Sequence, residues 1–314
     1  MNQRGEREMA FGRTLRFMLF AVACTAWIGL SAWRTPAAAE PPPLGKPVII
    51  YAHGPWSSGR VLFALGKTLL EKLGYTVQDK ILDTGIIYAS LASGNVDLFS
   101  SAWLPGQQSY LDRFGDKLDL LSFSIVPVPG GLMVPTYMHV DSIADLKQPE
   151  VVQALDGKII GIDAGAGVSM RTKQAIDAYG LPLQLVNSSD AAMSAAFKSA
   201  YEAHKPIVVT GWCPHVLCAL YSTKFLADPK GIYGHNRDLH VVRLGFRNDF
   251  PRATAFLARF TTTDQELSKL LVWTDAEHMS DEQAVQKFMA ENPALIWYMI
   301  DGLAPGLEKP ANVD

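Results

Sequence analysis

The first third of the chain alternates short apolar runs with helical patterns, and this alternation restricts the fold more than any other feature. Residues 46–52, 76–82 and 96–99 are short runs rich in apolar and β-branched side chains, typical of buried strands. Residues 59–74 place leucines at helical spacing, and residues 85–94 form a shorter helical pattern. Strands joined by helices usually pair in parallel, so we predict an α/β unit with a parallel sheet and covering helices.

A second unit of the same kind occupies the middle of the chain. Strands are expected at residues 158–162, 184–186 and 207–209, with helices at residues 170–179 and 191–204 between them. Because strand and helix alternate again, this unit also predicts a central sheet flanked by helices.

The middle unit is inserted in sequence into the first one. A further strand is expected at residues 239–245, and the rest of the chain is predicted to be helical. We therefore assign residues 46–134 plus 236–314 to lobe one and residues 135–235 to lobe two. Two chain crossings between lobes suit a hinged protein, so the sequence predicts a hinge and an interlobe cleft.

The N-terminal residues have the pattern of a secretory signal peptide. A positively charged start precedes an apolar run over residues 17–32, and an alanine-rich stretch ends at Ala39. We assign residues 1–39 to a cleaved signal peptide and expect the mature protein in the periplasm. A lipoprotein anchored through Cys24 is the alternative, but the apolar run continues past that cysteine.

Composition excludes some classes of partner. The 314 residues are 48% hydrophobic and 19% charged, which is globular composition and enough for two domains. Residues 1–39 hold five arginines and two acidic residues, so the mature chain has 23 basic and 29 acidic residues, a net charge of −6. An acidic chain offers no basic face to nucleic acid. We expect a monomer without a cofactor or a nucleic-acid partner.

Two cysteines, Cys213 and Cys218, remain after the predicted cleavage. A spacing of five on a helix leaves the two Cα atoms too far apart for easy bridging, so a disulfide would need a non-helical turn. The oxidising compartment permits such a bond, and the sequence leaves the choice between thiols and disulfide open. The run Cys-Pro-His-x-x-Cys lacks the paired spacing of zinc motifs, so no metal site is expected.

Three tryptophans follow predicted strands. Trp56 follows the first strand, Trp103 the third, and Trp212 the strand at residues 207–209. Open α/β sheets bind ligands at the carboxyl ends of their strands. Two of these tryptophans belong to lobe one and one to lobe two, so closing the cleft would bring the indoles together.

The guest that best matches three indoles is a quaternary ammonium. Its charge is spread over methyl groups, and it needs no hydrogen bonds. Each desolvated indole face contributes about 2 kcal/mol to binding such a cation. Three faces would supply a large share of the roughly 8 kcal/mol that a micromolar affinity represents. The alternative is that each tryptophan only packs against its sheet.

Several longer motifs resemble one known family. They are GIIYASLASGNVD (85–97) followed by AWLP (102–105), GIDAGAG (161–167), NSSDAAM (187–193), KPIVVTGWCPH (205–215) and FLADPKGIYG (225–234). In this order they resemble the substrate-binding proteins of glycine betaine, choline and proline-betaine ABC transporters, over residues 47–300. The resemblance implies a two-lobed periplasmic binding protein fold, type II-like, and a membrane ABC permease as partner. It also implies an aromatic cage that contains Trp56, Trp103 and Trp212.

Two departures from the family bear on the ligand. Some members place a tryptophan in the glycine loop where this chain has Ala166. Choline-binding members carry an aspartate two residues after the first tryptophan, where this chain has Ser58. The resemblance therefore favours glycine betaine or a related quaternary amine over choline. Choline, carnitine and other amines stay open as alternatives.

A betaine also carries a carboxylate, for which the sequence offers several candidates. Ser57, Ser58 and Gly59 open a helix, where free N–H groups and the helix dipole favour an anion. The family uses a histidine in the region of His215 to contact the carboxylate. Ser169, in the glycine loop of lobe two, is a further polar candidate.

The alternative hypothesis to a binding protein is an enzyme. An α/β-hydrolase would need Gly-x-Ser-x-Gly at a strand-to-helix turn, and the closest string, at residues 167–171, lacks the final glycine. We therefore predict a binding protein rather than an enzyme. A receptor or chemotaxis module without a transporter has the same sequence features and stays open.

Overall fold

The computed structural model describes residues 40–311 and 313. The predicted signal peptide and Cys24 lie outside the described residues. Pro41–Asp314 form one compact unit. Among the residues described, no helix is long and apolar enough to cross a membrane.

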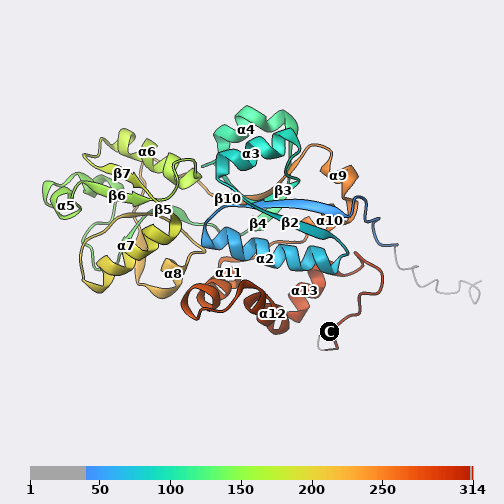
Figure 1. Cartoon of the computed structure of the whole chain (residues 1–314). Coiled ribbons are helices and arrows are strands. Elements are labelled where there is room, and N and C mark those ends of the chain that lie inside the picture. Colours follow the sequence, from blue (N-terminus) through green and yellow to red (C-terminus); the bar gives the residue numbers. More distant parts are fainter. Residues whose placement is uncertain (1–39, 312, 314) are drawn as a thin grey trace, which may run out of the picture. The chain divides into compact units, whose positions relative to one another are not determined.

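The described residues form two five-stranded sheets with helices around them (Figure 1). The strands are β1 (Val48–His53), β2 (Thr76–Ile81), β3 (Leu98–Leu104), β4 (Leu118–Ile125), β5 (Gly130–Pro135), β6 (Lys158–Gly161), β7 (Gln184–Asn187), β8 (Val209–Trp212), β9 (Thr223–Phe225) and β10 (Arg237–Arg243). The helices are α2 (Ser57–Lys72), α3 (Thr84–Ser93), α4 (Gln108–Phe114), α5 (Pro149–Ala154), α6 (Gly167–Tyr179), α7 (Asp190–Glu202), α8 (Val216–Leu220), α9 (Phe246–Asp249), α10 (Pro251–Leu257), α11 (Asp264–Leu271), α12 (Asp281–Glu291) and α13 (Pro293–Ile300). Three shorter turns are η1 (Gly115–Lys117), η2 (Ile143–Lys147) and the π-helical η3 (Val272–Ala276).

The first sheet has the strand order β2-β1-β3-β10-β4. β1 pairs in parallel with β2 and β3, as the alternation of strands and helices predicts. β10 returns from the far end of the chain and runs antiparallel to β3 and β4, so the sheet is mixed. Helix α2 packs against β1 and β2, and α11 and α12 pack on α2. Figure 1 shows α3 and α4 on the opposite side of the sheet.

The second sheet has the order β7-β6-β8-β5-β9. β6 pairs in parallel with β7 and β8, and β5 runs antiparallel to β8 and β9. Helices α6 and α7 lie on either side of this sheet (Figure 1). Each lobe is therefore a central sheet flanked by helices, as the sequence predicts.

The lobe boundary needs one adjustment. β5 is a strand of the second sheet, although the sequence analysis places residues 130–134 in lobe one. The chain crosses between the sheets at residues 126–129 and returns at residues 226–236. We propose that lobe two begins at Gly130 and that these two crossings form the hinge.

Strand β8 runs further than the apolar pattern predicts. Thr210, Gly211 and Trp212 continue the strand because they pair with the start of β5. A side chain at Gly211 would meet the Cβ of Met133 at 2.5 Å, so only glycine fits between the two strands. Trp212 is therefore the last residue of the strand and not the first residue after it. Trp103 likewise lies inside β3.

Three apolar clusters hold the fold together. One lies in lobe one around α2 and the C-terminal helices, and another fills lobe two. The third contains residues of both lobes, including Trp56, Phe99, Phe197 and Trp212. This shared cluster places two of the predicted site tryptophans in one region.

Candidate ligand-binding pocket

A pocket lies between the two lobes, and both contribute to its lining. The three tryptophans Trp56, Trp103 and Trp212 all line it. The cavity has a volume of about 50 Å³, several times the minimum that one buried water needs. The structure thus brings these three side chains, which the sequence places at strand ends, to one pocket.

Two glycines make room for the Trp56 indole. Trp56 is the N-cap of α2 and is 8% exposed. A Cβ at Gly54 would lie 1.8 Å from its ring, and a Cβ at Gly59 would lie 2.6 Å from its Nε1. Any larger residue at either position would displace the indole. Gly59, a predicted ligand contact, lies against Trp56 and is not part of the pocket lining.

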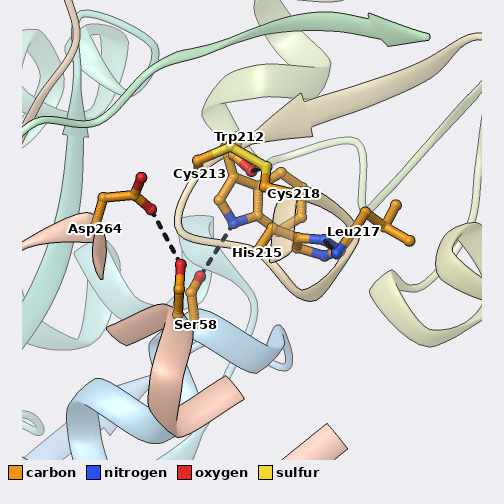
Figure 2. The surroundings of a disulfide bond; sticks show 8 residues. Ser58, Trp212, Cys213, His215, Leu217, Cys218 and Asp264 are labelled. Atoms are coloured by element: carbon orange, nitrogen blue, oxygen red, sulfur yellow. Dashed lines mark hydrogen bonds between the residues drawn. A yellow bond between two sulfur atoms is a disulfide. The ribbon is translucent and has the colours of Figure 1, made fainter. Parts of the chain in front are cut away.

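Trp212 is held by a contact from the other lobe. Its indole N–H donates to the hydroxyl of Ser58 over 3.1 Å, and both side chains are buried (Figure 2). Ser58 also lines the pocket. The bond joins lobe two to the first turn of α2, so the structure represents a closed arrangement of the lobes.

A disulfide follows Trp212 directly. Cys213 and Cys218 are bonded, with their Cα atoms 6.3 Å apart (Figure 2). Helix α8 begins only at Val216, so the residues between the cysteines start with a non-helical turn. A non-helical turn is the condition that the sequence analysis gives for a bond between these two cysteines. Of the two states that the sequence leaves open, free thiols and a disulfide, the structure has the disulfide. The short loop that it closes lies next to the tryptophan.

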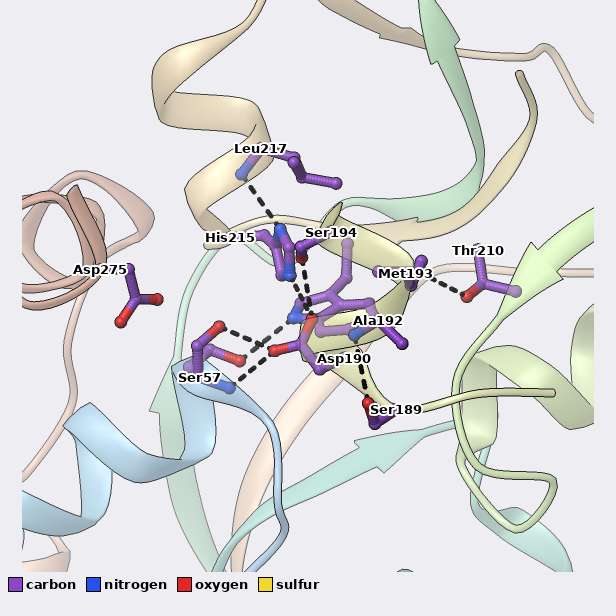
Figure 3. Close-up of polar contacts among 12 residues, drawn as sticks. Ser57, Ser189, Asp190, Ala192, Met193, Ser194, Thr210, His215, Leu217 and Asp275 are labelled. Carbon is purple, nitrogen blue, oxygen red and sulfur yellow. Dashed lines mark hydrogen bonds and ion pairs between the residues drawn. The ribbon is translucent and has the colours of Figure 1, made fainter. Parts of the chain in front are cut away.

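His215 lies behind Trp212, outside the pocket lining. Its ring meets the indole edge-on, with the centroids 4.6 Å apart. Its Nδ1 accepts the backbone N–H of Leu217 over 3.1 Å, and its Nε2 lies 2.7 Å from Oδ1 of Asp190 (Figure 3). Because Nδ1 accepts, Nε2 carries a proton and donates to the carboxylate. Both ring nitrogens are therefore occupied inside the protein.

Ser57 is also engaged away from the pocket. Its backbone N–H and its hydroxyl both donate to Oδ2 of Asp190, each over 2.9 Å (Figure 3). Burial raises the pKa of the Asp190 carboxyl, but His215 and the two donors of Ser57 outweigh burial and hold the pKa below its usual range. Asp190, at the start of α7, is thus an ionised acceptor at the N-terminus of α2. The sequence analysis does not identify it.

Ser169 is buried in the first turn of α6, and its hydroxyl points to the carbonyl of Ile162 at 3.4 Å. It does not line the pocket. Of the eight site residues predicted from the sequence, four line the pocket and four do not. The lining contains Trp56, Trp103, Trp212 and Ser58, and the residues outside it are Ser57, Gly59, Ser169 and His215.

The lining also contains polar residues that the sequence prediction does not name, namely Thr84, Ser101, Gln107, Arg171, Tyr233, Asn236 and Asp238. Thr84 begins α3, Arg171 lies in the second turn of α6, and Asp238 lies near the start of β10. The guanidinium of Arg171 donates to the carbonyl of Pro105 across the lobes over 2.8 Å. For Asp238 the sequence offers one signal, because this acidic residue directly precedes the apolar run of β10.

Two α/β lobes that share one tryptophan-lined pocket define a two-lobed solute-binding protein. Residues 46–291 match the family described as the substrate-binding domain of the ABC-type glycine betaine transport system. The chain belongs to this family. The predicted family and the prediction of a binding protein rather than an enzyme are confirmed.

Individual relatives agree with this assignment. The chain is 38% identical over 149 residues to the glycine betaine/carnitine transport binding protein GbuC of Listeria monocytogenes, a match that covers 46% of this chain. The match spans about half of that relative's length, 49%.

Two solved structures match over most of the chain. Lactococcal OpuAC, in its closed form with glycine betaine, matches with a TM-score of 0.75 and 28% identity, covering 81% of this chain and 99% of that one. The glycine betaine/L-proline-binding protein ProX of Borrelia burgdorferi matches with a TM-score of 0.76 and 30% identity, covering 80% and 96%. The predicted periplasmic binding protein fold is confirmed.

Proposed function

We propose that this protein is a periplasmic solute-binding protein that captures glycine betaine, or a related quaternary amine, and delivers it to a membrane ABC permease. The observation that carries this proposal is a single pocket lined by Trp56 and Trp103 from lobe one and by Trp212 from lobe two. Membership of the family supports the transport role. The lactococcal relative with glycine betaine bound supports the ligand class.

The cationic head of the ligand is proposed to lie against the indole faces. A trimethylammonium group has no hydrogen bonds to lose, so apolar rings replace its water at little cost. Each face contributes about 2 kcal/mol, and the three together approach the roughly 8 kcal/mol of a micromolar affinity. Because the indoles come from both lobes, the guest gains contacts on closure and favours the closed state.

The ligand carboxylate is proposed to lie near Arg171 and the first turn of α6. Gly167 and Val168 of that turn line the pocket together with Arg171. Free N–H groups at a helix start and a guanidinium both attract an anion. The Nε of Arg171 is buried and has no hydrogen-bond partner among the described residues, which leaves a donor for the guest.

The eight residues predicted from the sequence take two roles in this proposal. Those proposed to touch the guest are Trp56, Trp103, Trp212 and Ser58. Those proposed to hold the contact residues or the closed lobes in place are Ser57, Gly59, Ser169 and His215.

Calorimetry with glycine betaine, choline, carnitine and proline tests the proposal. We expect the purified protein to bind glycine betaine with micromolar or tighter affinity and to change its tryptophan emission on binding. Absence of binding to every quaternary amine would refute the proposed function.

The proposed export has its own test. A secretory signal ending at Ala39 implies an exported mature chain that begins at Glu40, and we propose that this chain acts as a monomer in the periplasm. The intact mass of the protein recovered from the periplasm should equal that of residues 40–314. A mass that retains residues 1–39, or a lipid on Cys24, would overturn the assignment.

A further inference from the structure

Asp238 is a buried carboxyl group beside which the described residues place no paired cation. Its side chain is 1% exposed and lines the tryptophan pocket. Neither carboxylate oxygen has a hydrogen-bond partner of normal geometry among the described residues. An unsatisfied buried carboxyl group is costly, and native proteins seldom keep one without a reason.

Other buried acids of this protein are paired. Asp97 accepts the guanidinium of Arg243 over 2.6 Å and the backbone N–H of Ile50 over 2.8 Å. Asp190 has the donors described above. Within the part of the chain that the structure describes, Asp238 has neither a cation nor a hydrogen-bond donor of this kind. Because Asp238 lines the pocket, a guest there is in position to supply the missing positive charge.

The position of Asp238 in the sheet places it beside the proposed cage. In the antiparallel pairing of β10 with β3, Asp238 is directly opposite Trp103. Side chains directly opposite each other share one face of the sheet, with Cβ atoms about 4.5–5.5 Å apart. Thr84 lines the same pocket, and its buried hydroxyl also has no partner among the residues described. A carboxyl group and a hydroxyl thus accompany the indoles on the lobe-one side.

We propose that Asp238 is the counter-charge of the cationic head group, so that the pocket selects guests by formal positive charge and not only by shape and apolar area. This inference rests on the proposed function of the pocket. A carboxylate a few ångströms from a desolvated cation stabilises it far more than it would in water. The guest in turn supplies the positive charge that no described residue places beside Asp238.

The protonation of Asp238 follows from the same geometry. Burial raises the pKa of its carboxyl well above the usual range, and the Ser124 hydroxyl and the backbone at Leu239 only partly offset this. A cation placed beside it favours the ionised form and lowers the pKa again. Binding should therefore release a proton, and affinity should rise with pH until the empty pocket is itself ionised.

Few other groups near Asp238 change charge over the same range. Burial raises the pKa of Tyr51, Tyr88 and Tyr233, and it lowers the pKa of His240 to about 4, so all four stay neutral between about pH 5 and 9. The charged or titratable groups on the flanking segments include Asp83, Asp119, Arg171, His235, Arg237 and Arg243, and Asp119 is paired with Arg247. His235 and Arg237 are exposed, and Arg243 is paired with Asp97.

Paired guests with and without the charge test this role. Choline and its carbon isostere, dimethylbutanol, have the same shape, as do glycine betaine and dimethylbutanoate. We expect Asp238→Asn to weaken binding of choline and glycine betaine at least about tenfold and to leave the neutral-headed isosteres within about threefold. Asp264→Asn, which removes a carboxylate outside the pocket lining, is the matched control and should change neither.

A second measurement needs no variant. Titrations of the wild-type protein with glycine betaine, in buffers of different ionisation enthalpy between pH 5 and 9, report the protons released on binding. We expect release at the acidic end and an affinity that rises with pH. Affinity that is flat with pH and without proton release, or an Asp238→Asn variant that keeps its preference for charged guests, would overturn the inference. Failure of the wild-type protein to bind any quaternary amine would instead refute the proposed function.

Discussion

Ser57 donates both its backbone N–H and its hydroxyl to Oδ2 of Asp190, each over 2.9 Å, and so joins α2 of lobe one to α7 of lobe two. The other carboxylate oxygen accepts from His215. All three residues lie outside the tryptophan pocket. The closed arrangement therefore has an anchor that does not depend on contact with a guest, and it is a charge-assisted one.

This anchor predicts that Asp190→Asn weakens ligand binding without changing ligand preference. The amide keeps the shape of the carboxylate but loses its charge, and one of its ends can no longer accept a hydrogen bond. Hydrogen bonds to charged groups contribute about 1.5–3 kcal/mol, so we expect roughly tenfold weaker binding of glycine betaine. Calorimetry with glycine betaine and choline checks this. A change in their ranking would place Asp190 in the pocket chemistry and contradict a purely anchoring role.

The same carboxylate predicts a pH dependence of stability. The pKa of Asp190 lies below its usual range in the folded protein. Its contribution is therefore fully present above the unfolded value of about 4 and is lost as pH falls through the lowered folded value. We expect Asp190→Asn to be less stable than the wild-type protein at pH 7, with the gap closing in acid. Urea unfolding at pH 7 and pH 3 measures it, and an equal gap at both pH values would refute the assignment.

Trp212 is predicted to carry a large share of the ligand affinity. Trp212→Ala removes one indole face and the bond to Ser58, and about 2 kcal/mol for the face alone predicts more than tenfold weaker binding of glycine betaine. Trp297→Phe, outside the pocket lining, is the control and should bind normally. Unchanged affinity in Trp212→Ala would remove Trp212 from the cage.

Glycine betaine is predicted to bind more tightly than choline. The hydroxyl of Ser58 already accepts from Trp212, and no acid stands at this position to receive the hydroxyl of choline. Arg171 in the lining favours a guest that carries a carboxylate. Competitive titration of the two ligands gives the ranking. Tighter binding of choline would reverse this preference and leave the fold and family untouched.

The sequence predicts most of the fold, and four of the eight site residues that it names line the pocket. The differences have physical reasons. Trp56, Trp103 and Trp212 could be found because local patterns reveal strand ends, where α/β proteins bind ligands. His215 was assigned to the ligand because its neighbours resemble the family motif, whereas its ring is occupied by Asp190, 25 residues away in the chain. A pattern within a short stretch of sequence does not indicate a contact between residues so far apart in the chain.

The sequence analysis does not name Asp238, and it places residues 130–134 of β5 in lobe one, for a related reason. β10 lies between β3 and β4 as an antiparallel strand that arrives from more than 100 residues away, and only this pairing places Asp238 beside Trp103. β5 belongs to the second sheet because it pairs with β8 and β9, which come much later in the chain. Long-range pairing of this kind depends on tertiary packing and has no signature in a short window of sequence.

A crystal structure of the protein grown with glycine betaine tests the central claim most directly. The account predicts that the quaternary nitrogen lies within about 6 Å of the ring centroids of Trp56, Trp103 and Trp212 at once. It further predicts that a carboxylate oxygen of Asp238 faces the methyl groups. Glycine betaine bound elsewhere, or held by the tryptophans of one lobe alone, would contradict the account.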